Sequence, residues 1–533
     1  MSETSLKPGT YAAADPGHPA AIDFATGTVL TYGELEERSR RLAGLWREHG
    51  LRPADHVAVL LDNQVSYFEV AWAAQRAGLY LTPVNWHLGP DEAGYIVGDC
   101  GARSVVATAR LGPLVAALAP AGTDAVHLLL DGAEGAGGAG LDGWEDYVSA
   151  VDAAPPIDPA DEVEGSWMFY SSGTTGRPKG IMPPWRELPF GSGGVLDALV
   201  TGLYGFRPGI TYLCPAPLYH AAPLAWSLSA QRIGGTVVVL DRFDAEATLQ
   251  AIERYRVTHA QFVPTHFVRM LKLDPAIRER YDLSSLEMVV HAAAPCPPDI
   301  KDRMLDWLGP IVHEYYSASE GAGFCAIGPD EWRAHRGSVG KSLLGAVHIV
   351  GTDGGELPVG EAGQVWFDSQ VRFEYHGDPA KTAEAIDVDR GWATIGDIGH
   401  LDGDGYLYLT DRVAHTVISG GVNIYPREIE DVLVVHPAVT DVAVIGVPDD
   451  EMGERLLAVI QPAPGSALAG DDGADLAQAL RTYCRERLAG FKVPREVVFI
   501  DELPRLPTGK IRKSELRSRF GTWSGTATTH ADR

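Results

Sequence analysis

The chain has 533 residues, of which 45% are hydrophobic and 22% charged, as expected for a globular protein of two or more domains. Its net charge of −27 at pH 7 argues against the nucleic-acid backbone or an anionic membrane as the main partner. The five cysteines form no CxxC pair or Cys/His cluster, no apolar run reaches the ~18 residues of a membrane span, and the N-terminus lacks a signal-peptide core; we therefore expect a cytoplasmic protein without a disulfide framework, structural zinc or a spanning helix.

Strand-like and helix-like runs alternate through the first part of the chain. Residues 56–61 predict a buried strand, residues 65–77 a helix and residues 79–83 the next strand. Further core strands are expected at 235–240 and 288–290. This alternation predicts an α/β fold in which helices are layered on largely parallel sheets.

Two later stretches differ from this pattern. Residues 132–140 are almost all Gly and Ala, which predicts a surface loop. Residues 340–411 contain short strands with frequent glycines, as in a small β-barrel subdomain. A second, smaller α+β unit is expected after Asp411-Arg412. Its predicted elements are a helix from residue 428, a strand at 442–445, a loop at 465–475 and a helix at 476–488.

We therefore divide the chain into three parts. Residues 1–411 form the expected N-terminal domain and residues 412–520 the expected C-terminal domain. Residues 521–533 are polar, and we expect this tail to be disordered.

The stretch from Ser171 to Gly180 carries the strongest functional signal. It reads Ser-Ser-Gly-Thr-Thr-Gly-Arg-Pro-Lys-Gly. Glycines let the backbone approach a ligand closely, and the N–H groups, hydroxyls and two cations can surround an anion. A flexible linker is the plain alternative, and a Walker loop does not fit because Gly180 follows Lys179. The predicted phosphate-binding residues are Ser171, Ser172, Gly173, Thr174, Thr175, Gly176 and Lys179.

This loop resembles the signature of the adenylate-forming superfamily, which includes acyl-CoA synthetases, adenylation domains of peptide synthetases and beetle luciferases. Further segments that resemble the family's motifs follow in the family's order from His220 to Lys510 and cover most of the chain. The resemblance implies ATP or AMP, Mg²⁺ and coenzyme A as cofactors. It also implies a layered α/β N-terminal domain with a small β-barrel subdomain, followed by a mobile α+β C-terminal domain.

Activation of an acid by ATP has an electrostatic obstacle, because a carboxylate must attack a phosphate. At ~4 Å two like charges repel by roughly 4 kcal/mol at an effective dielectric near 20. A lysine and Mg²⁺ at the reacting oxygens can offset this repulsion. Pro507-Thr508-Gly509-Lys510 resembles the family segment whose lysine bridges the carboxylate and the α-phosphate. The alternative is a solvated lysine in a basic tail.

The segment from Tyr315 to Glu320 resembles the family's Tyr-Gly-x-Thr-Glu. In the family the aromatic ring stacks on adenine, the hydroxyl reaches the phosphate and the glutamate helps to hold Mg²⁺. The resemblance gives these roles to Tyr316, Ser319 and Glu320, with Glu320 as the metal and catalytic candidate. Ser317 stands where glycine is usual, which affects the expected shape of the acyl pocket.

Two more segments resemble nucleotide-binding motifs. The run from His291 to Pro295 resembles the small-residue turn beside adenine, although alanine-rich turns are common. Its binding candidates are Ala292, Ala293, Ala294 and Pro295. Trp392–Asp397 resembles the segment whose aspartate binds the ribose hydroxyls, with Asp397 in place and Ile395 at the usual threonine position. Arg412 matches the arginine that contacts the ribose or the phosphate.

The remaining motifs concern the thiol. Pro217–His220 resembles the motif whose histidine lies near the carboxylate and the thiol entry tunnel, so His220 is a catalytic candidate, with a structural histidine as the alternative. The segment 418–426 resembles the glycine-rich lining of the pantetheine tunnel, with Gly420 and Gly421 as candidates. Lys492, in Gly-Phe-Lys-Val-Pro, is a candidate contact for a CoA phosphate.

The hinge between the domains departs from the family's pattern. Ala414 occupies the position of a charged hinge residue, and His415 stands where aspartate is frequent. A hinge works through changes in φ and ψ, so an apolar residue there does not by itself prevent rotation. Together with Ile395 and Ser317, this departure leaves the balance of the two half-reactions open.

The sequence as a whole favours an acyl-CoA synthetase. It would convert a carboxylic acid and ATP to an acyl-adenylate and transfer the acyl group to CoA. A ligase that loads a carrier protein, a specialised ligase that runs mainly thioester formation from a supplied acyl-adenylate, and a silent nucleotide-binding relative are the alternatives. A homodimer stays open.

The acid cannot be named from the sequence, but its class can be narrowed. The predicted pocket segments lie around Trp185, 220–223, 262–265, Ala292 and 317–323, and they are mainly apolar or small. They hold no obvious partner for the second charge of an amino acid. A fatty, aryl or bulky alicyclic acid is therefore expected.

Overall fold

The computed structural model describes most of the chain. The described residues are 6–118, 126–131, 143–171, 178–294, 296–368, 373–412, 415–419, 422–449, 452–464, 466, 473–505 and 511–521. The predicted loop at 132–140, most of the predicted loop at 465–475, and the tail beyond Gly521 lie outside these ranges.

The largest sheet of the described residues has nine strands in the order β17-β16-β15-β14-β13-β11-β12-β1-β2. The pairs from β1 through β12, β11, β13 and β14 to β15 are parallel, and the outer pairs are antiparallel. The strands are β1 Pro19–Asp23, β2 Val29–Thr31, β11 Thr211–Cys214, β12 Thr236–Val239, β13 His259–Phe262, β14 Met288–His291, β15 Val312–Tyr316, β16 Phe324–Ile327 and β17 Lys341–Leu344.

A second, fully parallel sheet has the order β7-β6-β5-β3-β4-β8 among the described residues. Its strands are β3 His56–Leu60, β4 Tyr80–Pro83, β5 Ser104–Thr108, β6 Val126–Leu130, β7 Glu145–Asp146 and β8 Ser166–Trp167. The largely parallel α/β architecture predicted from the alternating pattern is thereby confirmed.

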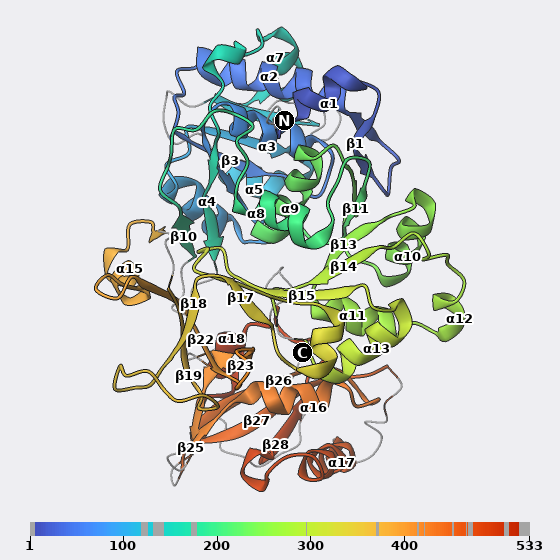
Figure 1. The fold of residues 1–533 in the computed structure, drawn as a ribbon, viewed down its shortest axis with the longest axis vertical. Coiled ribbons are helices and arrows are strands. Elements are labelled where there is room, and N and C mark those ends of the chain that lie inside the picture. Colours follow the sequence, from blue (N-terminus) through green and yellow to red (C-terminus); the bar gives the residue numbers. More distant parts are fainter. Residues whose placement is uncertain are drawn as a thin grey trace.

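Helices of the N-terminal domain cover these two sheets (Figure 1). They are α1 Pro8–Ala14, α2 Tyr32–Glu48, α3 Ser66–Arg76, α4 Pro90–Asp99, α5 Gly112–Ala117, α7 Tyr147–Ala153, α8 Val195–Tyr204, α9 Ala221–Arg232, α10 Ala245–Tyr255, α11 Pro264–Leu271, α12 Pro275–Arg278, α13 Pro298–Leu308 and α14 Pro329–Ala334.

Helix α2 illustrates how local sequence forms these elements. Thr31 and Glu34 make a reciprocal capping box at its start, which satisfies free N–H groups of the first turn. Leu35, Leu42 and Trp46 recur at helical spacing and are buried. The same helix therefore has a defined start and a single apolar face toward the core.

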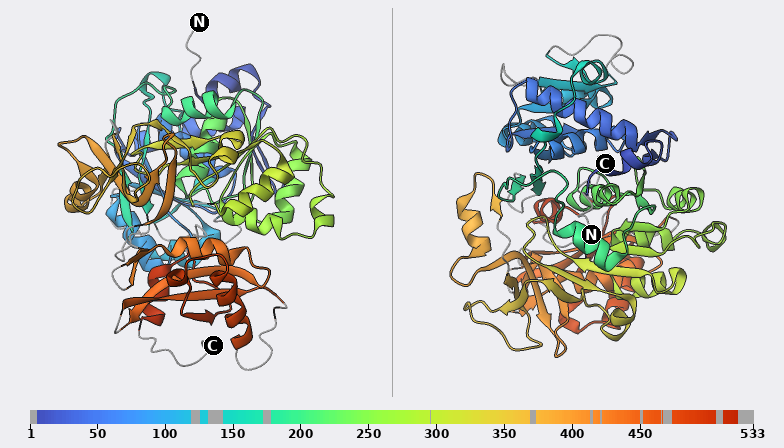
Figure 2. Two further views of the ribbon diagram at one scale, coloured as in Figure 1. Left: turned by 60° about the horizontal axis from the view of Figure 1, so that its bottom comes forward. Right: turned by 45° about the horizontal axis from the view of Figure 1, so that its top comes forward.

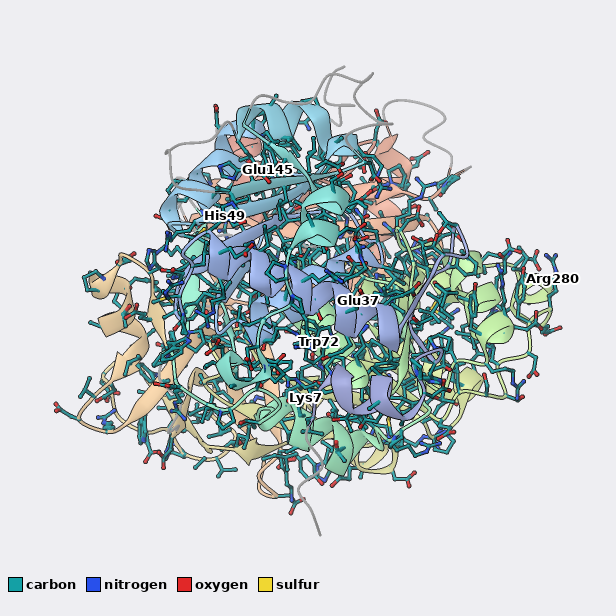
Figure 3. All side chains as sticks on the ribbon, turned by 90° about the horizontal axis from the view of Figure 1, so that it is seen from above. Lys7, Glu37, His49, Trp72, Glu145 and Arg280 are labelled. Carbon is teal, nitrogen blue, oxygen red and sulfur yellow. The ribbon has the colours of Figure 1, made fainter. Side chains whose placement is uncertain are left out.

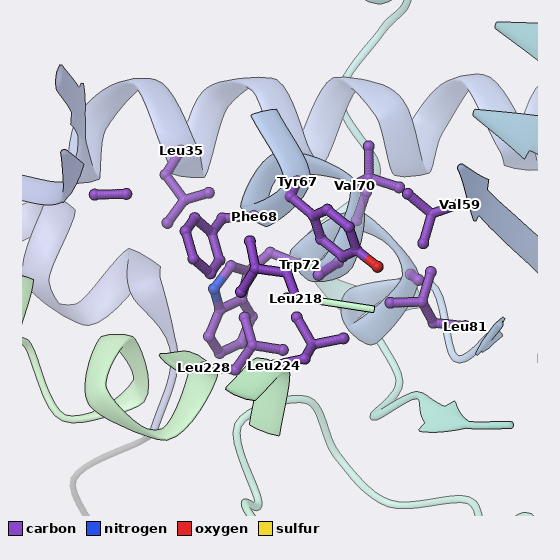
Figure 4. Packing of buried hydrophobic residues seen from close by; sticks show 14 of the residues in the cluster. Leu35, Val59, Tyr67, Phe68, Val70, Trp72, Leu81, Leu218, Leu224 and Leu228 are labelled. Carbon is purple, nitrogen blue, oxygen red and sulfur yellow. The ribbon is translucent and has the colours of Figure 1, made fainter. Parts of the chain in front are cut away.

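The main core lies between α2, α3 and α9. Figure 4 shows Trp72 of α3 beside Leu224 and Leu228 of α9, with Tyr67 close to Leu218. The indole N–H of Trp72 donates to Gln231 Oε1 at 2.7 Å, so this buried polar group is paired. Seen from above, Trp72 lies toward the middle of the molecule, whereas Arg280 projects at its rim (Figure 3).

The described residues before the C-terminal domain also form two smaller sheets. The five-stranded sheet has β18 Ala346–Val350, β19 Gly363–Asp368, β22 Trp392–Leu401, β21 Ile386–Asp387 and β23 Leu407–Arg412. The three-stranded sheet has β20 Glu374–Tyr375, β10 Lys179–Met182 and β9 Phe169–Ser171. The five-stranded half-barrel sheet matches the stretch 340–411, where the sequence predicts a small β-barrel subdomain, and helix α15, Pro379–Ala385, lies in the same stretch. The three-stranded sheet also contains β9 and β10 from earlier in the chain.

The C-terminal domain is the smaller α+β body drawn in orange and red at one end of the molecule (Figures 1 and 2). Its sheet has β25 Val422–Ile424, β24 Val417–Ser419, β27 Gly453–Pro462, β26 Val439–Asp449 and β28 Glu496–Phe499. Its helices are α16 Pro426–Val434, α17 Ala474–Arg485 and α18 Lys513–Phe520. None of the helices in the described ranges combines the length and the apolar character needed to cross a bilayer.

Candidate functional site

The two ends of the predicted phosphate loop are paired with each other. β9 and β10 are antiparallel, and Ser171 lies opposite Lys179. The loop residues between them, Ser172, Gly173, Thr174, Thr175 and Gly176, lie outside the described residues. Lys179 Nζ lies 3.3 Å from Asp378 Oδ2, the carboxylate that caps α15. Asp378 therefore holds the Lys179 ammonium group at the end of the predicted phosphate loop. Sequence reasoning did not identify Asp378 as a partner of Lys179.

The aromatic and ribose candidates lie in direct contact. Tyr316 ends β15, and Asp397 lies in β22, which belongs to the neighbouring five-stranded sheet. The Tyr316 hydroxyl donates to Asp397 Oδ2 at 2.7 Å, and both side chains are at least nine-tenths buried. The contact fixes a phenol ring and a carboxylate relative to one another.

Asp397 also lies opposite Arg412. The two residues are Cα partners across β22 and β23. Gly396, which directly precedes Asp397, has φ of +80°, a conformation that side chains rarely adopt. Glycine is therefore needed at this position to turn the strand so that Asp397 faces Tyr316.

The predicted adenine turn follows the end of β14, beside Tyr316 on the parallel neighbour β15. Ala292 is buried, while Ala293 and Ala294 are exposed. Ala293 has φ of 72°, a strained conformation for alanine of the kind found at ligand sites. Pro295 lies outside the described residues.

Sequence reasoning missed a buried charge cluster beneath this turn. Lys301 Nζ lies 2.6 Å from Glu314 Oε2, and His291 Nε2 lies 3.4 Å from the same oxygen. Burial raises the pKa of Glu314 while Lys301 opposes that rise, and burial lowers the pKa of His291 well below its usual value. The sequence did not indicate the Lys301–Glu314 ion pair, because a lysine in a helix is usually on the protein surface.

His220 forms the N-cap of α9, where its side chain makes no capping bond. Its Nε2 is buried and has no hydrogen-bond partner among the described residues. Burial, with a smaller effect of His87, lowers the pKa of His220 to about 3. The imidazole is therefore neutral at physiological pH, and Nε2 is a buried polar atom whose hydrogen-bonding capacity is not used by the described residues.

Glu320 accepts a hydrogen bond from the Tyr375 hydroxyl at 3.0 Å, and Ser319 beside it is exposed. Tyr375 lies on β20 opposite Ile181 of β10, the strand that follows the phosphate loop. Tyr375 therefore connects that strand to Glu320. No group of three or more His, Cys, Asp or Glu residues that could hold a metal occurs among the described residues. One carboxylate with a hydroxyl fits Mg²⁺, which is usually held by few carboxylates together with water and phosphate.

Three aromatic rings stack in the core of the N-terminal domain. Tyr315 lies between Trp226 of α9 and Phe324 of β16, with ring centroids 5.4 and 5.1 Å away and nearly parallel planes. Gln261 Nε2 donates to the Tyr315 hydroxyl at 2.7 Å. Trp226, Tyr315 and Phe324 belong to the buried core, and none of them lies in a predicted acyl-pocket segment.

Of the candidates for CoA binding in the C-terminal domain, the structure describes Lys492. Lys492 pairs with Glu428 of α16 within its own domain. Gly420, Gly421 and Lys510 lie outside the described residues. Ile418 and Val422, on the strands that flank the two glycines, are 55% and 48% exposed.

Comparison with known proteins agrees with this geometry. The family described as AMP-binding enzyme matches residues 10–373, and the AMP-binding enzyme C-terminal domain matches residues 428–510. The chain belongs to the family of AMP-binding enzymes.

Similar individual proteins span nearly the whole chain. A feruloyl-CoA synthase of an Amycolatopsis species is 38% identical over 514 residues, which is 95% of this chain and 96% of the relative. The fatty acid–[acyl-carrier-protein] ligase ScoC of Streptomyces coeruleorubidus is 32% identical over 97% of this chain and 96% of its own. The structure of the amide bond synthetase McbA from Marinactinospora thermotolerans superposes with a TM-score of 0.79, at 28% identity, over 97% of this chain and 100% of that one.

Proposed function

We propose that this protein is an AMP-forming acyl-CoA ligase that converts a carboxylic acid and ATP to an acyl-adenylate and pyrophosphate, and then transfers the acyl group to CoA with release of AMP. The observation that carries the proposal is the contact between Tyr316 and Asp397 beside the adenine turn. This arrangement supports a nucleotide site at the carboxyl ends of the parallel strands, where open α/β sheets commonly bind ligands.

Candidate residues are available to bind the base, the ribose and the phosphates of ATP. Tyr316 and Ala292–Ala294 would hold the base, Asp397 and Arg412 the ribose, and Lys179 with the phosphate loop the phosphates. The Ser319 hydroxyl would reach the phosphate, and Glu320 would help to hold Mg²⁺, which supplies charge neutralisation at the phosphates. Lys510 would place its charge at the attacking carboxylate and the α-phosphate, where a positioned cation stabilises the developing negative charge.

His220 suits the acyl side of the second step. A neutral imidazole whose Nε2 has no partner among the described residues can accept or donate one hydrogen bond next to the acyl carbonyl. Its low pKa makes it a weak base, so we assign it to orientation of the carboxylate and the incoming thiol rather than to storage of a proton.

We infer an aryl acid as the preferred substrate class, with fatty and bulky alicyclic acids as alternatives. The feruloyl-CoA synthase relative, whose name indicates an aryl acid, supports this class.

An assay must also identify the acceptor of the acyl group in the second step. The relatives' names indicate CoA, a carrier protein and, for the amide bond synthetase, an amide product. Glycines in the 418–426 segment favour a narrow channel for a pantetheine thiol, which CoA and a carrier protein share.

The test combines an acid panel with three acceptors. Pyrophosphate release is measured with cinnamic, fatty and alicyclic acids, and product formation is then followed with CoA, a phosphopantetheinylated carrier protein and a simple amine. We expect an aryl acid and CoA to give the highest turnover. Absence of pyrophosphate release with every acid would contradict the proposed adenylation.

A further inference from the structure

A single lysine connects the two domains through main-chain carbonyls. Lys272 directly follows α11, and its Nζ lies 3.0 Å from the carbonyl oxygens of both Val439 and Thr440, at the start of β26. Burial, and then the nearby Arg303, lower the pKa of Lys272. The Lys272 ammonium group is thus partly buried where it contacts the C-terminal domain.

The start of β26 is built to receive this cation. The pairing of β26 with β27 shifts between Val439 and Asp441, which indicates a β-bulge at Thr440. A bulge leaves a residue out of the ladder and redirects its polar groups. The two carbonyls can therefore point away from the sheet, toward Lys272.

Strand β26 also forms an ion pair with Arg505, which precedes Lys510 by five residues in the sequence. The next residue of β26, Asp441, forms an ion pair with Arg505, the last described residue before Lys510. Burial, with a further contribution from Arg269 of α11, lowers the pKa of Arg505 to about 10. Arg505 therefore lies close to the N-terminal domain, and Asp441 offsets its repulsion from Arg269.

The surrounding domain interface is loosely packed. A hollow of about 340 Å³ is lined by Pro297, Pro298 and Arg336 on one side and by Glu428, Val435 and Tyr483 on the other. α16 lies next to α13 in Figure 1. Interfaces between domains of one chain are commonly polar and permit relative motion, so individual polar contacts can bias the placement of the domains.

We propose that Lys272 is a positioning residue for adenylation: it holds the start of β26, and through Asp441 and Arg505 the segment that leads to Lys510, against the N-terminal domain. This inference rests on the proposed function, since it assigns Lys510 to the first step. Thioester formation from a supplied acyl-adenylate does not need that lysine. The contact therefore supports one half-reaction and not the other.

The kinetic test compares Lys272→Met with Lys381→Met, a lysine of α15 whose partner Glu384 lies on the same helix. Pyrophosphate release in a single turnover should fall by about tenfold or more in Lys272→Met, because the ammonium group loses its two hydrogen bonds to main-chain carbonyls. Thioester formation from synthetic acyl-adenylate should stay unchanged, and Lys272→Arg should recover most of the adenylation rate. The control should match wild type in both steps.

A second measurement does not depend on activity. Hydrogen exchange of the peptide that contains Val439–Asp441 should rise about threefold or more in Lys272→Met and stay unchanged in the control, because a local contact is lost. Unchanged exchange, unchanged adenylation, or an equal fall of both half-reactions would each overturn the role of Lys272. Failure of the wild-type protein to adenylate any acid would instead overturn the proposed function, and the exchange result would still decide whether Lys272 holds β26.

Discussion

The hydroxyl of Tyr316 donates a hydrogen bond to Asp397 Oδ2 across 2.7 Å, although the two residues are 81 positions apart in the chain. The bond connects the last residue of a strand in the nine-stranded sheet with a strand of the five-stranded sheet. It fixes the proposed adenine and ribose contacts relative to one another before a nucleotide binds. Such preorganisation lowers the cost of ordering the site on binding.

Removal of this hydroxyl should therefore weaken nucleotide binding without abolishing it. Tyr316→Phe keeps the ring for the base and loses the bond to Asp397. Because a hydrogen bond to a charged group contributes about 1.5–3 kcal/mol, the Kd for ATP should rise by about tenfold or more. Titration calorimetry with a non-hydrolysable ATP analogue measures this change. An unchanged Kd would mean that the ribose does not depend on this contact.

Gly396 offers a matched test of the strand geometry. Gly396 and Gly405 have φ of +80° and +82°, and an added Cβ would meet nothing within 4 Å at either position. Alanine at each should cost a similar ~1–2 kcal/mol of folding free energy, measured by urea unfolding. Only Gly396→Ala should also raise the KM for ATP, because Gly396 precedes Asp397. Equal KM values in the two variants would contradict the proposed ribose contact.

The pair of Lys179 with Asp378 predicts a gain of affinity on mutation. Asp378 competes with phosphate for this cation at a partly exposed site, where solvent weakens the ion pair. Asp378→Asn should therefore lower the KM for ATP about twofold to fivefold, and Lys179→Ala should raise it. A higher KM in Asp378→Asn would show that the carboxylate helps phosphate binding instead.

Burial of His220 predicts a specific pH dependence of stability. Its folded pKa of about 3 lies below the ordinary value of 6.5, so on acidification the unfolded chain takes up this proton and the folded protein does not. Stability should fall as the pH drops below 6.5. At about pH 5 the loss from this group is about 2 kcal/mol.

His220→Gln removes this group and should flatten that part of the curve. Urea midpoints of the two proteins, compared at about pH 7.5 and about pH 5, give the difference directly, and the higher pH serves as the control because neither state binds the proton there. His259, His266 and His291 share the sign of the effect and cancel in the comparison. Parallel curves for the two proteins would mean that His220 is hydrated in solution.

The features that could be predicted from the sequence are those that depend on short, contiguous stretches of the chain. The runs that form β3, α3 and β4 have clear apolar patterns, and the adenylate-forming motifs are short contiguous segments. Asp378 followed by Pro379 is also a local signal, an N-cap before a proline at the first helical position, but it lay within a stretch interpreted only as short strands.

Long-range packing explains most of what the sequence did not reveal. The bonds of Tyr375 to Glu320 and of Lys272 to β26 join residues whose distance depends on how separate sheets and domains pack. Lys301 and Glu314 are close in sequence, yet their burial depends on α13 covering β15. No residue pattern within one element carries that information.

The central claim, that one protein adenylates an acid and then forms a CoA thioester, is tested most directly by a single-turnover rapid-quench experiment. Enzyme in excess over a radiolabelled aryl acid is mixed with ATP, Mg²⁺ and CoA, and acyl-adenylate and thioester are separated at each time point. The account predicts that acyl-adenylate rises first and then decays at the rate at which thioester appears, and that Lys510→Ala removes the first phase but still converts added acyl-adenylate. Thioester formation from added acyl-adenylate without any adenylation from ATP, across a broad set of acids, would contradict it.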